Sequence, residues 1–272
     1  MQARAIAIRR SLLALEPDDQ DLARLLAKGL QVEQSRAEQS GETEKSLALA
    51  EEVLAIRAKL ASARPEDARV ARERMLAELA RGRALVRAGR ANDAVGGLQA
   101  ACVTATERVE RAPDSHEALS DRALGYESLA QVLEELGQRD EALERTRLAR
   151  ADLARAAGLA PDSEAYPRRG AYLASREAKV LVALGRAVEA ARVGADGAAV
   201  FEGILARGAV TADVQQQAAV MFAVASSSAA KVGDADAAGR FAARARAALA
   251  ALPEARRAAL GGFIESELGG TK

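Results

Sequence analysis

The stretch PDSHEALSDRALGYESLAQVLEELGQRDEALERTRLARADLARAAGLA, from Pro113 to Ala160, has the residue spacing of two amphipathic helices that meet at Gly137. Apolar positions separated by three or four residues lie on one side of a helix and indicate a buried face. In the first helix this face consists of Leu119, Ala123, Tyr126, Ala130 and Leu133. A single helical hairpin cannot bury such a face alone, so neighbouring hairpins must stack against it.

The landmarks of this stretch recur every 48 residues along the chain. Glycines that can end a first helix are Gly41, Gly89, Gly137, Gly185 and Gly233. Prolines that can end a second helix are Pro17, Pro65, Pro113 and Pro161. Residues suited to an N-cap follow two positions later and are Asp19, Asp67, Ser115 and Ser163, with Thr211 continuing the series although Ala209 replaces the proline. Three columns in one register predict a helical repeat protein.

Each column has a physical basis. Asp, Ser or Thr at an N-cap accepts a hydrogen bond from a free N–H of the first helical turn. Glycine enters the left-handed conformation at a helix end without a Cβ penalty. Proline cannot continue a helix and disfavours helical conformation in the residue before it. The sequence therefore predicts an all-α protein of stacked antiparallel helix pairs, with first helices that begin near residues 19, 67, 115, 163 and 211.

The register also gives domain boundaries. We expect one continuous array that consists of a half repeat at 1–16, five repeats at 17–64, 65–112, 113–160, 161–208 and 209–252, and a C-terminal capping helix at 253–268. The segment from Ile6 to Pro17 aligns with the segment from Leu54 to Pro65, so the chain opens inside a second helix. Either the chain is a fragment of a longer polypeptide, which we expect, or Met1 starts a naturally truncated array.

The fourth repeat departs most from the pattern. Its second helix contains Gly194, Gly197 and Gly203, and each glycine in a helix interior costs roughly 1 kcal/mol relative to alanine. These glycines indicate either a hinge or close partner approach, or tight packing between helices. Pro167 follows Ser163 closely and predicts that this first helix begins a few residues late.

Composition excludes several classes of function. The 39 Lys and Arg residues balance the 39 Asp and Glu residues, which gives no support for a nucleic-acid partner. No apolar run approaches the roughly 20 residues that cross a bilayer, and the first residues lack a signal-peptide core, so we predict a cytoplasmic chain without a membrane segment. The abundance of arginine and alanine is typical of a GC-rich bacterial genome.

Residues for catalysis are missing. Phosphate-loop and dinucleotide-binding glycine patterns and kinase signatures do not occur in the sequence. His116 is the only histidine and Cys102 the only cysteine, so neither a zinc site nor a Cys–His dyad can form. We interpret Cys102 as a buried packing residue and His116 as a solvated surface residue. The sequence thus predicts a chain with no enzymatic activity, no metal and no cofactor.

The first helix of the third repeat reads Tyr126-x2-Leu129-Ala130-x2-Leu133-x3-Gly137-x4-Ala142. This pattern resembles the tetratricopeptide repeat (TPR), with small residues at corresponding places such as Gly82, Ala178 and Ser226 in first helices. The usual TPR unit has about 34 residues, so these 48-residue units have longer helices. The resemblance covers almost the whole chain and implies a right-handed α-solenoid that binds other proteins.

A narrower likeness concerns the segments LAIRAKLASARPED and IAIRRSLLALEPDD, which begin at Leu54 and Ile6. They look like long-period repeats of large bacterial proteins, which often lie C-terminal to a serine/threonine kinase domain. Two functions follow from the two resemblances. The chain is a scaffold whose concave groove binds a segment of another protein, or it is a regulatory or assembly region of a bacterial kinase whose catalytic domain lies upstream.

In TPR proteins the concave groove is lined by first helices, so the resemblance also implies a candidate site. Residues six positions before successive turn glycines include Arg83, Gln131 and Lys179, whose side chains can donate hydrogen bonds to peptide carbonyls or carboxylates. The full predicted set of peptide-binding residues is Leu76, Arg83, Leu124, Glu127, Gln131, Tyr172, Arg176 and Lys179. We name this set the first-helix ladder. The alternative interpretation is that its polar members are merely solvated.

Overall fold

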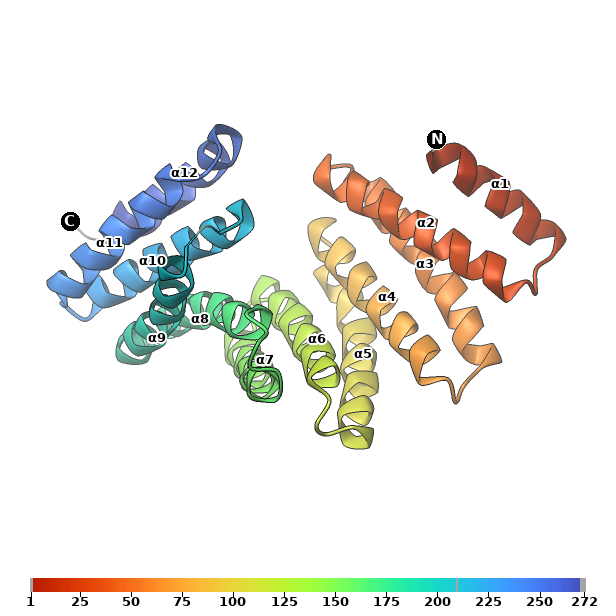
Figure 1. Cartoon of the computed structure of the whole chain (residues 1–272), viewed down its shortest axis with the longest axis horizontal. Helices are drawn as coiled ribbons and strands as arrows, with labels where there is room; N and C mark the ends of the chain where they lie inside the picture. The colour runs from red at the N-terminus through yellow and green to blue at the C-terminus, as the bar shows by residue number, and fades with distance from the viewer. Residues whose placement is uncertain (1, 209, 270–272) are drawn as a thin grey trace. The chain divides into compact units, whose positions relative to one another are not determined.

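The computed structural model describes residues 2–208 and 210–269 of the chain, and in these ranges it contains twelve α-helices and no strand. The helices are α1 (Gln2–Leu15), α2 (Gln20–Gln39), α3 (Thr43–Ala63), α4 (Ala68–Arg87), α5 (Ala91–Arg111), α6 (His116–Glu135), α7 (Arg139–Leu159), α8 (Ala165–Ala183), α9 (Ala187–Ala206), α10 (Ala212–Lys231), α11 (Ala235–Ala250) and α12 (Glu254–Gly269). The predicted all-α fold of helix pairs is confirmed (Figure 1). The expected first residue of the fifth repeat, Ala209, lies outside the described residues, as does Met1.

The turn glycines and most N-caps act as the register predicts. All five turn glycines have φ between +70° and +78°, the left-handed region in which a side chain would be strained. Asp19 and Asp67 each accept two backbone N–H bonds at the start of α2 and α4. Ser115 accepts one from Ala118 N (3.1 Å), and Thr211 accepts one from Val214 N (3.4 Å).

Ser163 does not cap a helix, and this part of the prediction is wrong. Helix α8 begins at Ala165, Glu164 occupies the N-cap position, and no side chain accepts a capping hydrogen bond there. The late start agrees with Pro167, whose fixed φ and missing N–H suit the first turn of a helix but not its interior.

The helices form two compact units. Unit 1 comprises the residues up to Asp114 together with Leu124–Gly137, and unit 2 comprises Ser115–Ala123 together with the residues from Gln138 onward. In unit 1, successive helices from α1 to α5 pack against each other; these run from red to yellow in Figure 1. In unit 2, successive helices from α7 to α11 pack in the same way, α8 also contacts α10, and α12 contacts both α10 and α11.

Small residues let helices of a pair approach closely. A Cβ added to Gly82 in α4 would lie 2.5 Å from Leu98 Cδ2 in α5, so a larger residue would force the buried Leu98 side chain to move. In unit 2, Ser226 of α10 is buried and donates a hydrogen bond to the carbonyl oxygen of Ala238 in α11 (2.8 Å). Gly82 and Ser226, two of the positions that resemble TPR small residues, therefore lie at close contacts between paired helices.

The fourth-repeat glycines show the same tight packing. A Cβ on Gly194 would lie 3.1 Å from Ala225 Cα, and one on Gly197 would lie 2.6 Å from Met221 Sδ and 3.0 Å from Ala174 Cβ. These contacts with α8 and α10 favour the packing interpretation over the hinge. Gly203, in contrast, has no neighbour within 4 Å of an added Cβ.

Candidate functional site

The first-helix ladder is divided between α4, α6 and α8. Leu76 and Arg83 lie on α4, and Leu124, Glu127 and Gln131 lie on the part of α6 that belongs to unit 1. All five are half-buried, which leaves part of each side chain at the surface. Tyr172, Arg176 and Lys179 lie on α8 in unit 2; the first two are half-buried and Lys179 is exposed. The two groups are therefore described separately.

The first helices of unit 2 form a pocket that contains one ladder residue. The pocket has a volume of about 420 Å³ and is lined by Arg168, Tyr172, Asp213, Gln216, Gln217 and Val220, which belong to α8 and α10. Arg168 and Gln216 occupy the same place in consecutive repeats, as do Tyr172 and Val220. Matching positions of two first helices thus line one cavity, which we call the α8–α10 pocket.

The polar groups of the α8–α10 pocket are partly engaged with each other. Arg168 Nη1 donates a hydrogen bond of 3.4 Å to Gln217 Oε1, a length at the weak end of the range. Asp213 forms an ion pair with Arg256 of α12. The remaining donors and acceptors, beside the apolar surfaces of Tyr172 and Val220, suit a peptide segment. Sequence reasoning missed Arg168, Gln216 and Gln217, although the 48-residue register that gave Tyr172 also pairs Arg168 with Gln216.

Lys179 is engaged by the C-terminal helix. Its Nζ lies 3.1 Å from Glu267 Oε1 and 4.7 Å from the centre of the Phe263 ring, and both partners belong to α12. An ammonium over an aromatic ring and beside a carboxylate gains electrostatic stabilisation from both. Lys179 therefore contributes to the docking of α12 as well as to the predicted ladder.

A buried carboxylate fixes α8 next to α7. Glu177 is almost fully buried and accepts a hydrogen bond from Arg147 Nε (2.8 Å), and Arg150 forms a second ion pair with it. The hydrogen bond that Arg147 donates to Glu177 is the main reason why the pKa of Arg147 is raised above its ordinary value. Burial of a charge is tolerated only with such partners, so this cluster holds the helix that carries Tyr172 in a fixed position.

Cys102 and His116, the two residues considered for catalysis or metal binding, both lie against other parts of the fold. Cys102 is buried, as predicted. His116 is half-buried and not simply solvated, because its Nδ1 lies 2.7 Å from Tyr166 Oη, a partner 50 residues away that the local sequence could not reveal.

Within residues 2–208 and 210–269, no group of three His, Cys, Asp or Glu residues could hold a metal ion. No helix in these ranges is both long enough and apolar enough to span a membrane.

Comparisons with known proteins find similar folds among solved structures. No protein-family model matches the chain, and no curated protein matches it either. Among solved structures, BtubC (BKLC) from P. vanneervenii is similar with a TM-score of 0.69 and 17% identity, over 92% of this chain and 89% of that one. A putative kinesin light chain from Podosopora anserina with nearly identical TPR-like repeats is similar with a TM-score of 0.61 and 19% identity, over 84% of this chain and 96% of that one.

These similarities define the class of fold. Two solved structures match most of the chain, and one of them is described by its TPR-like repeats. The protein therefore has a TPR-like α-solenoid fold. At such low identity the likeness concerns the fold alone, and function has to be argued from the site.

Proposed function

We propose that this protein is a non-catalytic scaffold that binds an extended segment of a partner protein along the first helices of its repeats. The supporting observation is the α8–α10 pocket, in which matching positions of consecutive first helices line a cavity of about 420 Å³. In unit 2 the segment contacts Arg168, Tyr172 and Gln217. In unit 1 the corresponding contacts are the ladder residues Leu76, Arg83, Leu124, Glu127 and Gln131.

The chemistry of the α8–α10 pocket defines the partner segment. Arg168 and the glutamine amides donate hydrogen bonds to carbonyl or carboxylate oxygens, which favours acidic or carbonyl-rich segments. Exposed ion pairs contribute only about 0–1 kcal/mol, so most of the affinity has to come from apolar side chains that pack on Tyr172 and Val220. Mixed charges on the ladder, such as Glu127 together with Arg83, predict weak binding of non-specific polyanions.

Peptide selection on the immobilised chain tests the proposal. Peptides from a random displayed library are enriched, synthesised and measured by isothermal titration calorimetry. We expect Arg168→Glu to weaken binding by at least about tenfold, because the substitution places a negative charge beside an acidic segment. Arg192→Glu is the matched control, since Arg192 is an exposed arginine on the neighbouring second helix α9. Arg83→Glu applies the same test to unit 1.

Two results would contradict the scaffold proposal. If the selected peptides bind Arg168→Glu and Arg83→Glu as tightly as the unaltered chain, the first helices are not the binding surface. If no peptide is enriched above the level of a surface without protein, the chain is not a binder of extended segments. The thermal unfolding midpoint of each variant shows whether a loss of binding reflects a loss of folding.

The alternative is a regulatory or assembly region that acts on a bacterial serine/threonine kinase domain. It rests on the likeness of the segments that begin at Ile6 and Leu54 to kinase-associated repeats. The genomic sequence upstream of Met1 tests it, because a kinase domain encoded there in the same reading frame supports this function. A different upstream gene leaves the general scaffold as the function.

A further inference from the structure

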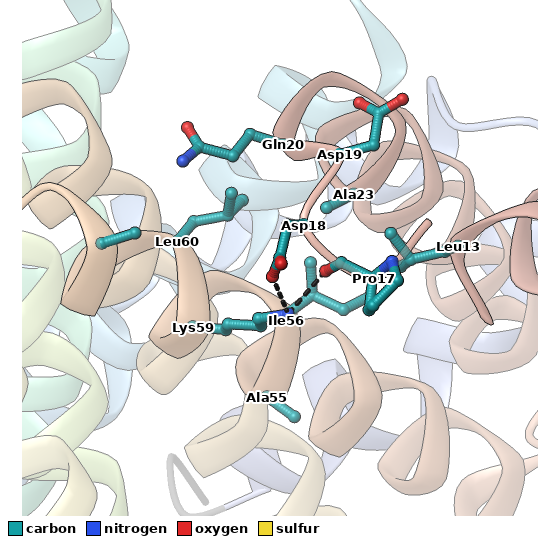
Figure 2. Close-up of a pocket in the computed structure, with 11 residues that line it drawn as sticks. Leu13, Pro17, Asp18, Asp19, Gln20, Ala23, Ala55, Ile56, Lys59 and Leu60 are labelled. Carbon is teal, nitrogen blue, oxygen red and sulfur yellow. Dashed lines mark hydrogen bonds and ion pairs between the residues drawn. The ribbon is translucent and has the colours of Figure 1, made fainter. Parts of the chain in front are cut away.

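A second cavity lies in unit 1, away from the ladder residues, where the beginning of α2 meets α1 and α3. It has a volume of about 490 Å³ and its walls are mainly apolar. Figure 2 shows Leu13 and Pro17 on one side of it and Leu60 and Gln20 on the other. Cavities of about 300–1,000 Å³ with apolar walls and few polar groups are typical of small-molecule sites. We call this cavity the α1–α3 pocket.

The next repeat explains why this pocket is open. The residue 48 positions after Leu60 is Arg108, whose Nη1 donates a hydrogen bond of 3.2 Å to the carbonyl oxygen of Ala68. Ala68 is in turn the counterpart of Gln20. In the second repeat a long guanidinium side chain thus spans the place that corresponds to the pocket. In the first repeat the shorter Leu60 leaves this space unfilled and gives it an apolar wall.

The edge of the pocket is fixed by one side chain. Lys59 Nζ donates a hydrogen bond to the carbonyl oxygen of Pro17 and lies 3.2 Å from Asp18 Oδ1; Figure 2 draws both interactions. These contacts tie the α1–α2 turn to α3. Asp19 is also engaged, because its carboxylate caps α2. Since both carboxylates in the lining have partners, the pocket favours a neutral ligand over a charged one.

One polar atom at the pocket lacks a partner. The side-chain oxygen of Gln20 is buried and accepts no hydrogen bond from the described residues. A buried acceptor without a donor is costly, whereas a ligand N–H or O–H would satisfy it. The pocket therefore combines an apolar volume with one hydrogen-bond acceptor, which is the arrangement that orients a small apolar ligand.

We propose that the α1–α3 pocket binds a small, neutral, largely apolar molecule that carries one hydrogen-bond donor. The donor pairs with Gln20 Oε1, and the hydrocarbon part packs against Leu13, Ile56 and Leu60. Aromatic compounds with a ring N–H and small aromatic amides belong to this class. This site does not depend on the peptide-binding function proposed for the first helices.

Two matched probes and two filling variants test the pocket. Indole offers a ring N–H, and 1-methylindole has nearly the same shape without the donor. Methyl chemical shifts of Leu13, Ile56 and Leu60 in the full chain should change on titration with indole. We expect 1-methylindole to bind about tenfold more weakly, because it leaves Gln20 Oε1 unsatisfied. Gln20→Leu should remove this discrimination between the probes.

Leu60→Arg should abolish binding, because it introduces the side chain that spans the corresponding place in the second repeat. Leu60 is buried, so Ala63→Phe is a second filling variant at an exposed position of the lining. Val103→Arg on the exposed surface of α5 is the control and should leave binding unchanged. Absence of shift changes with indole, equal affinity for both probes, or undiminished binding by Ala63→Phe would each overturn the proposal.

Discussion

The two terminal helices differ sharply in how they are covered. In unit 2, α12 packs on α10 and α11, and its Ile264 and Leu268 are 0% and 2% exposed. In unit 1, α1 packs on α2 through Ile6 but leaves Ile8 and Leu12 52% and 46% exposed. Both helices have apolar residues at helical spacing. The difference lies in the neighbours that cover them.

The residue that corresponds to Leu12 in the next repeat shows how neighbouring helices bury an apolar side chain. Leu60 is the counterpart of Leu12 one repeat later and is only 4% exposed. It packs with Ala23 of α2 and Val70 of α4, that is, with a first helix on either side. Position in the register therefore predicts which residue could be buried, but burial itself requires both adjacent first helices.

The largest expected change in the free energy of unfolding tests the difference in burial between α12 and α1. Ile264→Ala should lower the free energy of unfolding by about 2–5 kcal/mol, because it removes buried methyl groups and leaves a cavity. Leu12→Ala should change it by less than about 0.5 kcal/mol, because half of that side chain already contacts solvent. Urea denaturation followed by circular dichroism measures both. Equal effects would show that α12 is not part of the folded core of unit 2.

The helices were predictable because their signals are local. Turn glycines, prolines and N-cap residues act within one or two turns of the backbone, so their columns located the first helices, which begin within two residues of 19, 67, 115, 163 and 211. Ser163 failed because a nearby residue, Pro167, shifted the start of α8 to Ala165. A repeat register describes an average unit, so the late start of α8 was predicted from Pro167 itself and not from the register.

The candidate sites were less predictable because they depend on side chains from distant elements. Lys179 was placed by register, but its contacts with Phe263 and Glu267 come from α12, which is not part of any repeat. The α1–α3 pocket was missed entirely, since a cavity follows from what neighbouring side chains fail to fill. The exchange of Arg108 for Leu60 between equivalent positions was the one signal in the sequence that could have revealed it.

A second prediction extends the comparison from the end of unit 2 to its interior. Gly197→Ala should lower the free energy of unfolding by about 1–2 kcal/mol, because overpacking against Met221 and Ala174 outweighs the gain in helix propensity. Gly203→Ala in the same helix should raise it by up to about 1 kcal/mol, because an added Cβ there meets nothing within 4 Å. The same denaturation experiment measures both variants.

The two glycine variants are controls for each other, since they make the same chemical change in α9. If both stabilise the protein, the close contacts of Gly197 relax at little cost, and overpacking against Met221 and Ala174 does not outweigh helix propensity in α9. If both destabilise it, glycine is needed along the whole helix, and a hinge in α9 becomes the better interpretation.

The smallest expected change in the free energy of unfolding concerns the half-buried carboxylate of Glu78 in unit 1. Glu78 of α4 is half-buried, and a Cβ on Gly97 of α5 would lie 3.0 Å from its Oε2, so this glycine makes room for the carboxylate. Burial raises the pKa of Glu78 above its ordinary value, although Arg74 and Arg81 oppose the shift. A raised pKa means that folding favours the protonated form. The stability that protonated Glu78 contributes is therefore complete below the ordinary carboxylate range and is lost as the pH rises through the folded-state pKa.

Glu78→Gln should then be more stable than the unaltered chain at neutral pH by less than about 1 kcal/mol, and this advantage should vanish in acid. Glu135→Gln, at an exposed position of α6, corrects for the general effect of removing one carboxylate. Urea denaturation of both variants across the acidic range measures the difference, and an advantage of Glu78→Gln that persists or grows in acid would show that burial does not govern this charge.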